Sequence, residues 1–165
     1  MKQSPDHLPK RKKNRLSGYD YASVGTYFIT FCTQDMHCSL GRIVPPADAF
    51  HPPTVQLLPR GRTLDEAIQA IPAHYPRAAV ENYVVMPNHA HLLLRLDETE
   101  GEPVSVDRII RQLKRFVSAK HGKGMWQKGY HDHLIRDAED FERRWQYISD
   151  NPARWFEDKY CVPRE

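Results

Sequence analysis

The sequence lacks long hydrophobic runs, paired cysteines and a strong excess of one charge sign. Its longest apolar stretches fall far short of the roughly 20 residues that cross a bilayer, and no apolar stretch follows the charged N-terminus as in a secretory signal. Three cysteines without a Cys-x-x-Cys pair, Cys32, Cys38 and Cys161, indicate neither a disulfide framework nor a thiolate zinc site. We therefore expect a cytoplasmic protein that does not associate with membranes.

The composition favours one soluble globular domain. The chain has 165 residues, of which 40% are hydrophobic and 27% are charged, and this length supports one core of ordinary size rather than two. The formal net charge of +3 is a weak indication of a nucleic-acid partner by itself. The distribution of charge along the chain is more informative.

Basic residues concentrate in two segments. The first is residues 1–20, an aperiodic stretch that we expect to be a basic N-terminal arm, with Arg11, Lys12, Lys13 and Arg15 as candidate DNA contacts. The second runs over residues 108–133, where the only acid is Asp132. Each phosphate that a basic side chain neutralises releases counterions, so a basic arm and a basic helix face together favour a polyanion as partner.

The first half of the second segment has helical periodicity. Its apolar residues recur at intervals that place them on one stripe: Val106, Ile109, Ile110, Leu113, Phe116 and Val117. Arg108, Arg111 and Arg115 then share the opposite face. Charged outer faces are also ordinary features of solvated helices, so this face alone does not identify a DNA-binding surface.

The remaining patterns indicate strands and helices in alternation. Strands are expected at residues 27–32, 80–86 and 89–96, and helices at about 105–120 and 138–151. Thr63 and Glu66 have capping-box spacing, which predicts that a short helix begins there. Residues 41–60, with five prolines, predict a loop or an insertion. This order is typical of an α+β split βαβ sandwich, an antiparallel sheet with helices on one face.

Two His-x-His pairs are candidate metal sites. Side chains alternate along a strand, so His89 and His91 point to the same face and can converge on one cation, to which another element must add a third ligand. A pair of half-buried polar residues is the alternative. His131 and His133 have the same spacing but lie in a connection without strand periodicity, and we rank them second.

Tyr147 is a candidate nucleophile on the last expected helix. A tyrosine hydroxyl can form the covalent intermediate that conserves phosphodiester energy. Asn151 lies four residues later on the same face, where its amide oxygen could complete a metal shell. Seven other tyrosines compete for this role, and an aromatic core residue is the plainer interpretation of Tyr147.

Several blocks, taken in order, resemble the REP-associated tyrosine transposases, relatives of the single-tyrosine insertion-sequence transposases. The resemblance extends over about residues 11–155. The ordered set is far more specific than any one of its blocks: Gly25-Thr26-Tyr27-Phe28, Met86-Pro87-Asn88-His89-Ala90-His91, Trp126-Gln127-Lys128-Gly129-Tyr130, His133-Leu134-Ile135-Arg136 and Tyr147-Ile148-Ser149-Asp150-Asn151-Pro152.

The resemblance implies a ferredoxin-like fold with a C-terminal catalytic helix, in one catalytic domain over residues 21–165. It also implies that Mg²⁺ or Mn²⁺ is bound by His89, His91 and Asn151, with Tyr147 as nucleophile. The implied partner is single-stranded DNA with hairpin (REP-like) elements, bound by a monomer or homodimer that is nucleoid-associated in a bacterial cytoplasm while it acts. Gly25, Thr26, Tyr27 and Phe28 would contact this DNA, with Tyr27 where relatives have a stacking Trp.

These parts predict an enzyme that cleaves and rejoins DNA through a 5′-phosphotyrosine. Two alternatives stay open on the sequence. A non-catalytic nucleic-acid binder would stack bases on sheet aromatics such as Tyr27 and Phe31 and would need no metal. A phosphohydrolase would use the same histidines with water as nucleophile, and would not require Tyr147.

Overall fold

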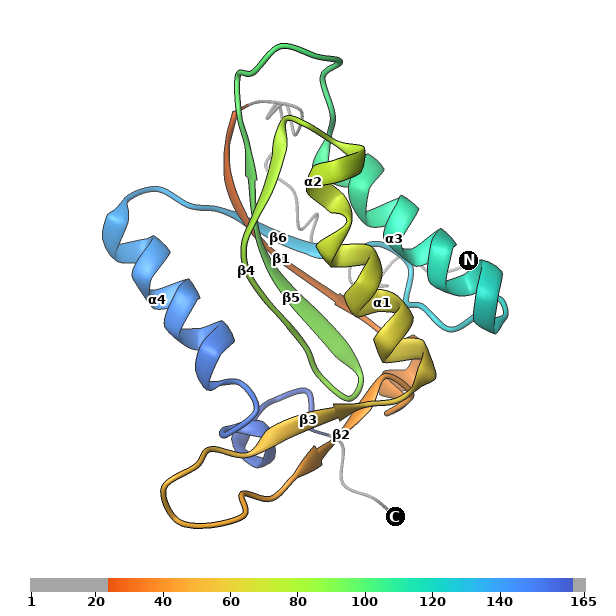
Figure 1. The fold of residues 1–165 in the computed structure, drawn as a ribbon, viewed down its shortest axis with the longest axis vertical. Helices are drawn as coiled ribbons and strands as arrows, with labels where there is room; N and C mark the ends of the chain where they lie inside the picture. The colour runs from red at the N-terminus through yellow and green to blue at the C-terminus, as the bar shows by residue number, and fades with distance from the viewer. Residues whose placement is uncertain (1–23, 162–165) are drawn as a thin grey trace, which may run out of the picture.

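The computed structural model describes residues 24–161. The arm residues Arg11, Lys12, Lys13 and Arg15 therefore lie outside the described residues. Within this range, four strands form an antiparallel sheet with the order β4-β5-β1-β6. The strands are β1 (Gly25–Cys32), β4 (Ala78–Val85), β5 (His89–Leu96) and β6 (His131–Leu134). Their order and the helices between them make the ferredoxin-like arrangement that the sequence predicted (Figure 1).

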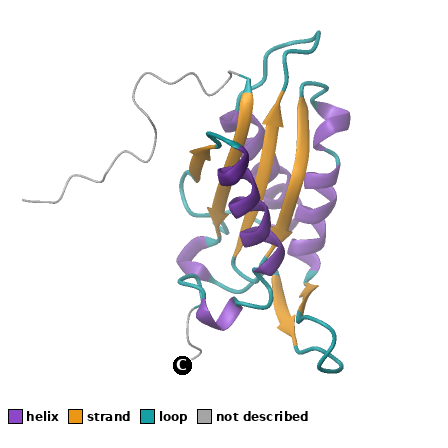
Figure 2. Cartoon of the chain, turned by 90° about the vertical axis from the view of Figure 1, so that its left-hand side faces the viewer, coloured by secondary structure: helices purple, strands orange, loops and turns teal. Residues whose placement is uncertain are grey.

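The helices divide between the two faces of the sheet. On one face lie α1 (Pro59–Gln69), α2 (Ile71–His74) and α3 (Val106–His121), and on the other lies α4 (Ala138–Asp150). Figure 2 shows α4 crossing the sheet on the side that faces the viewer, with the other helices behind. A short hairpin of β2 (Gly41–Val44) and β3 (Thr54–Leu57) and the 3-10 turns η1 (Gln34–Met36) and η2 (Trp155–Glu157) complete the description. None of the described helices is long and apolar enough to span a membrane.

Side-chain alternation along the central strands makes a separate core on each face. Tyr27, Ile29 and Phe31 of β1 are buried against α1, α2 and α3 together with Leu92 and Leu94 of β5. The intervening positions face α4, where a smaller cluster contains Phe28, Leu93 and Ile148. His89 and His91 have the same parity as Leu93, so both point to the α4 face.

Helix α3 forms where its apolar periodicity predicted it. Ser105 precedes the helix with extended backbone, and its side chain accepts a hydrogen bond from the backbone N–H of Arg108, which satisfies one of the free donors of the first turn. Five of the six stripe positions are buried, whereas Phe116 at the edge of the stripe is 43% exposed.

In the segment before β4, the structure favours an insertion over the loop at residues 41–60, and the expected helix cap at Thr63 was wrong. Residues 41–60 are not a continuous loop, because β2 and β3 pair across a proline-containing turn and α1 begins at Pro59. Thr63 is not a helix cap: it lies in the second turn, and its hydroxyl donates to the carbonyl of Pro59. Proline at the first helical position starts this helix, since its fixed φ suits the first turn and no N–H is lost.

The connection that contains His131 and His133 was also misjudged. It forms the edge strand β6, which pairs with residues 27–30 of β1. Strand periodicity was weak in the sequence because an edge strand of four residues is only partly covered by neighbours. The pairing places His133 opposite Phe28 on the sheet.

Candidate active site on the α4 face

The two histidines of β5 lie side by side in the interior. His89 and His91 have 0% and 1% of their surface exposed, and their ring centroids are 4.6 Å apart. The register with β1 places Cys32 opposite His89 and Thr30 opposite His91. Because two residues separated by one on a strand share a face, the pair predicted from spacing is brought together as expected.

The Nδ1 atom of each imidazole is already bonded. Nδ1 of His89 lies 2.8 Å from Oδ1 of Asn88, and Nδ1 of His91 lies 2.6 Å from the hydroxyl of Thr30. The Asn88 amide donates its own hydrogens to the carbonyls of Met36 and Tyr160, so its oxygen must accept from His89. The proton of neutral His89 is therefore on Nδ1, and Nε2 presents a lone pair.

Burial keeps both imidazoles neutral at physiological pH. It lowers the pKa of His89 to about 3, an effect that the neighbouring Asn151 amide opposes in part. Burial also lowers the pKa of His91 well below its ordinary value, and the adjacent His89 adds to this effect. Neutral imidazole is the form that ligates a metal.

The end of α4 supplies oxygen donors beside the histidines. Asn151, 2% exposed, is the C-cap residue directly after α4, and its amide lies next to both His89 and Tyr147. A carboxylate oxygen of Asp158 lies within 4.8 Å of the ligand nitrogens of His89 and His91. Among the described residues, Nε2 of both histidines and Oδ1 of Asn151 are buried without a hydrogen-bond partner. A buried polar atom of this kind is costly unless something binds it.

The side chain of Tyr147, on α4, packs against His91. Its ring meets His91 edge-on at a centroid distance of 5.2 Å and Phe28 at 5.9 Å. Burial raises the pKa of its hydroxyl and Asp158 adds to the rise, whereas Asn151, Arg144 and Arg154 act in the opposite direction. The phenol therefore stays protonated at neutral pH and requires help to become a nucleophile.

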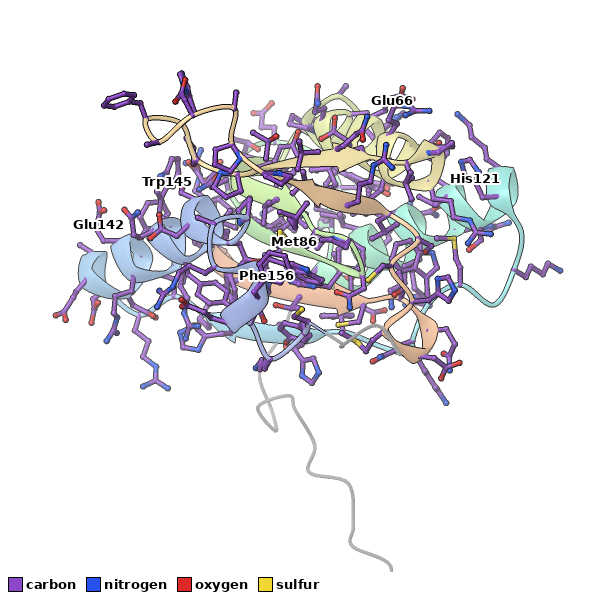
Figure 3. All side chains as sticks on the ribbon, turned by 90° about the horizontal axis from the view of Figure 1, so that it is seen from below. Glu66, Met86, His121, Glu142, Trp145 and Phe156 are labelled. Atoms are coloured by element: carbon purple, nitrogen blue, oxygen red, sulfur yellow. The ribbon has the colours of Figure 1, made fainter. Side chains whose placement is uncertain are left out.

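Two open cavities meet at Tyr147. One of about 470 Å³ lies toward the start of α4, and one of about 400 Å³ lies toward its end and η2. In Figure 3, Glu142 and Trp145 mark α4 on the left and Phe156 marks η2 beside it. Glu66 of α1 and His121 of α3 lie on the right, on the opposite side of the sheet. Tyr147 is therefore accessible from solvent along both directions of the helix.

Aromatic side chains of the C-terminal segment cover the histidines. The Tyr160 ring lies 4.4 Å from that of His89, and the Trp155 ring stacks on His89 at 6.1 Å. Burial raises the pKa of the Tyr160 hydroxyl. This cover excludes water from the imidazoles, and it explains why His89 is fully buried although it stands near the end of a strand.

The second His-x-His pair belongs to a different arrangement. His133 also faces α4, but its Nε2 lies 2.7 Å from Oδ2 of Asp140, and His131 is exposed. Within residues 24–161, the residues grouped closely enough to hold a metal are His89, His91 and Asp158. The lower rank given to His131 and His133 agrees with this geometry.

The other predicted DNA contacts do not gather at this site. Tyr27 is fully buried in the core beneath α1, α2 and α3. The expectation that its ring stacks on a base is wrong, because strand alternation turns it away from the α4 face. Phe31 is buried on the same side, so the stacking platform of the non-catalytic alternative is absent from the described sheet. Phe28 faces the site, and Gly25 and Thr26 begin β1.

The basic face of α3 lies on the opposite side of the sheet from the histidines. Arg108, Arg111 and Arg115 are exposed, and Arg111 forms an ion pair with Asp107 of the preceding turn. The helix packs on the sheet through its apolar stripe, so these arginines point away from Tyr147. They form a surface separate from the candidate active site.

Sequence reasoning missed several residues of the site. Thr30 and Asn88 orient the imidazoles, Asp158 adds a carboxylate, and Trp155 and Tyr160 cover the rings. Asn88 carried a usable signal, since it directly precedes the first histidine within the Met86–His91 block. Thr30 and Asp158 gave no signal, because only the strand register and the return of the chain after α4 bring them near His91 and His89.

Comparison with known proteins finds relatives among both curated proteins and solved structures, although no family model matches the chain. An uncharacterised protein of Haemophilus influenzae is 27% identical over 92% of this chain and 93% of its own length. A REP-associated tyrosine transposase of Escherichia coli is 32% identical over a matched segment that covers 46% of this chain. The same segment covers 44% of that relative, less than half of its length. A solved REP-associated tyrosine transposase bound to a REP hairpin has a TM-score of 0.61 and 24% identity, covering 87% of this chain and 77% of that one, and supports the fold.

Proposed function

We propose, from the premise that this chain is a relative of the REP-associated tyrosine transposases, that it cleaves and rejoins single-stranded DNA beside hairpin (REP-like) sequences. The observation that carries the proposal is the meeting of three features on the α4 face. Two buried neutral imidazoles present free Nε2 atoms, an orphaned amide oxygen lies beside them, and the accessible Tyr147 contacts His91. Neither a structural core nor a simple binding surface accounts for all three.

A divalent cation, Mg²⁺ or Mn²⁺, fits the donor set. His89, His91 and Asn151 would hold it, because the unsatisfied Nε2 atoms of β5 and the unsatisfied Oδ1 of Asn151 lie at the same site. Asp158, whose carboxylate is grouped with the two histidines, would be a further oxygen ligand. When bound, the cation would polarise a scissile phosphate and offset the negative charge that develops on it. Asn88 and Thr30 hydrogen-bond to the Nδ1 atoms of His89 and His91, which would fix the orientation of the two rings toward the cation.

Tyr147 is the proposed nucleophile. Its phenolic oxygen would attack the phosphorus in line, forming a phosphotyrosine bond while the bond to the 3′ oxygen breaks. The phenol releases its proton and the departing oxygen takes one up, which leaves a free 3′-OH and a 5′-phosphotyrosine. Attack by another 3′-OH reverses this step and joins two strands. Arg144 and Arg154 offset part of the rise in the Tyr147 pKa that burial causes.

The proposed enzyme is one catalytic domain over residues 21–165 with a basic arm at residues 1–20. Hairpin DNA, which is larger than the active site, would also contact basic surfaces away from it. We assign to this role the arm residues Arg11, Lys12, Lys13 and Arg15, the start of β1 at Gly25 and Thr26, and the α3 residues Arg108, Arg111 and Arg115. The active site uses residues of a single chain, which suits either a monomer or a homodimer.

The direct test is capture of the covalent intermediate. A labelled DNA hairpin with a single-stranded extension, incubated with the protein and Mn²⁺, should give a protein-DNA adduct that survives denaturing electrophoresis. Chelator should abolish it. Tyr147→Phe should form none, because it lacks the attacking oxygen but keeps the ring contacts with His91 and Phe28.

His89→Ala and Tyr160→Phe make the test specific. The first removes a proposed ligand and should abolish the adduct, whereas the second removes the hydroxyl of a neighbouring tyrosine and should retain it. Strand cleavage by Tyr147→Phe at the wild-type rate would instead support water as nucleophile, and an adduct formed by that variant would move the assignment to Tyr160 or Tyr130.

A further inference from the structure

The cavity on the N-terminal side of Tyr147 is lined by basic side chains to which the proposed mechanism assigns no contact with the DNA. Its lining comes from the end of β6 and from α4: His133, Arg136, Asp137, Asp140, Arg143, Arg144 and Tyr147. We propose that this cavity is a phosphate subsite for the single strand, where Arg136, Arg143 and Arg144 hold the backbone next to the scissile phosphate. This assignment rests on the proposed function and adds to it the path of the substrate.

The buried Asp140 gathers the cationic groups around the cavity. Its Oδ2 lies 2.7 Å from Nε2 of His133 and accepts from the backbone N–H of Arg136 at 3.2 Å. Its Oδ1 lies 3.5 Å from Nε of Arg144 and 3.7 Å from Nη2 of Arg143. Burial alone would raise the pKa of Asp140, but these neighbours lower it, so the carboxylate stays charged.

The cavity lining contains more arginines than acidic residues. The two carboxylates at the cavity are both engaged within it, since Asp137 caps α4 by accepting from the backbone N–H of Asp140 and Asp140 is shared among its partners. Arg143 is 67% exposed at its side chain, and its contact with Asp140 is long. The guanidinium groups of Arg143 and Arg144 share this one carboxylate, and Arg136 contacts it through its backbone N–H. The three side chains therefore offer donors that a phosphate can accept from, for which Arg has suitable geometry.

The cavity is connected to the reacting group. Arg143 and Arg144 precede Tyr147 by one helical turn, about 5.4 Å along the axis, and share its face. The Arg144 guanidinium lies over the Phe28 ring at 5.0 Å, and the same ring contacts Tyr147 and His91. On the other side of Tyr147 lie Asn151 and Asp158 in the second cavity. A strand laid along α4 would therefore meet the arginines, the nucleophile and the proposed ligands in succession.

The salt dependence of DNA binding tests this subsite. Binding of a fluorescent hairpin with a single-stranded extension would be measured in chelator over a range of salt concentrations, with Arg143→Ala and Arg136→Ala. Each lost phosphate contact on a single strand should reduce the slope of log affinity against log salt by about 0.7. Arg143→Lys should keep most of the slope because it keeps the charge. Arg62→Ala, an exposed arginine of α1, should bind as wild type.

The same hairpin without its extension locates the contact. The arginine variants should bind it like the wild type, because no strand then crosses the cavity. An unchanged slope with the extended DNA would overturn the subsite, and so would an equal loss with both DNAs, which would place the contact on the duplex. Wild-type slopes together with a normal Tyr147 adduct reject the subsite alone. Reduced slopes without any adduct keep the subsite and reject the proposed chemistry.

Discussion

The two imidazoles of β5 differ in how firmly their second nitrogen is held. Thr30 offers a hydroxyl that can donate or accept, so the proton of His91 has a choice of position. Asn88 has no such freedom, because two backbone carbonyls occupy both of its amide hydrogens. The orientation of His89 therefore depends on a side chain that is itself fixed by η1 and by the C-terminal segment.

Asn88→Ala should weaken metal binding without removing a ligand. His89 would lose the acceptor that holds its ring and its tautomer, and loss of such a partner costs about 10- to 100-fold in metal affinity. Calorimetric titration with Mn²⁺ measures the effect. Asn82→Ala is the matched control, since its amide contacts Trp145 and Ser149 of α4 rather than a histidine. Equal affinities in the wild type and a folded Asn88→Ala would show that Asn88 does not position His89.

Lys114 is a partly buried cation, and its lowered pKa should affect how the free energy of unfolding depends on pH. Its Nζ donates to the carbonyl of Gln127 at 3.0 Å and to that of Gly129. Burial lowers its pKa from 10.5 to about 8. Below pH 8 both folded and unfolded chains hold the proton, whereas between pH 8 and 10.5 the unfolded chain alone keeps it, so stability rises with pH across this window.

The rise should be absent from Lys114→Met. After allowance for partial exposure of the ammonium group, we expect the wild type to gain about 1 to 2 kcal/mol relative to this variant over that window. Urea denaturation at each pH gives the free energies. Lys123→Met, at an exposed position of the following loop, should parallel the wild type. A wild-type curve parallel to that of Lys114→Met would show that the lysine titrates normally.

At the scale of elements, α1 packs closely on the chain that follows η1. An ideal Cβ at Gly61 would lie 1.9 Å from the carbonyl oxygen of Leu40, and that oxygen also accepts from the backbone N–H of Leu58. Glycine is therefore required here by the approach of one backbone to another rather than by an unusual φ.

Gly61→Ala should destabilise the protein despite the helix preference of alanine. Alanine in a helix is favoured over glycine by about 1 kcal/mol, but relieving the overlap requires movement of backbone, and we expect a net loss of about 2 kcal/mol or more. Chemical denaturation measures this. Glu66→Ala, exposed on the same helix, should change stability little. A more stable Gly61→Ala would mean that α1 can shift away from Leu40 without cost.

The elements differ in how well the sequence specified them. Strand β5 was predicted at residues 89–96, its observed bounds, and α3 within one residue, because burial of one face imposes a clear period on each. Strand β6 and the β2-β3 hairpin were missed, since short edge elements bury too little to show alternation. The start of α1 was misplaced because the capping-box pattern at Thr63 competed with the proline at residue 59, and tertiary packing decided the outcome.

The candidate site was predictable in its local parts and not in its long-range ones. The pair His89 and His91 follows from strand spacing, and Tyr147 with Asn151 follows from helical spacing. The positions of Asp158 beside the histidines and of His133 beside Asp140 depend on where strands and turns meet across the fold. The burial of Tyr27 depends on which face α1 and α3 cover, which spacing within β1 does not reveal.

At the scale of the whole molecule, the sheet separates two surfaces with different properties. One face carries α1, α2 and α3 over the larger core, with the basic side of α3 exposed. The other carries α4 over the smaller cluster of Phe28, Leu93 and Ile148. Few apolar contacts hold α4 to the sheet, so polar interactions at its ends are important for its position. A cation at the histidines would be one of these, because its ligands come from both β5 and the end of α4.

Metal binding should therefore stabilise the fold as a whole. Mn²⁺ at 100 times its dissociation constant would add about 2.7 kcal/mol to the free energy of unfolding, provided that the unfolded chain does not bind it. Thermal or urea denaturation across a Mn²⁺ series should show this gain, and chelator should remove it. His89→Ala and His91→Ala should lose the gain, whereas Tyr147→Phe should keep it because no proposed ligand is changed.

The same series distinguishes the oxygen ligands. Asn151→Ala removes a buried amide at the end of α4, and Asp158→Ala removes a carboxylate beyond η2, so the variant that loses more of the gain identifies the stronger ligand. Stabilisation by Mn²⁺ that persists in His89→Ala and His91→Ala would place the cation elsewhere. If Mn²⁺ binds these residues, it connects the sheet to α4 and so fixes the distance between the metal ligands and Tyr147, which in-line attack on one phosphate requires.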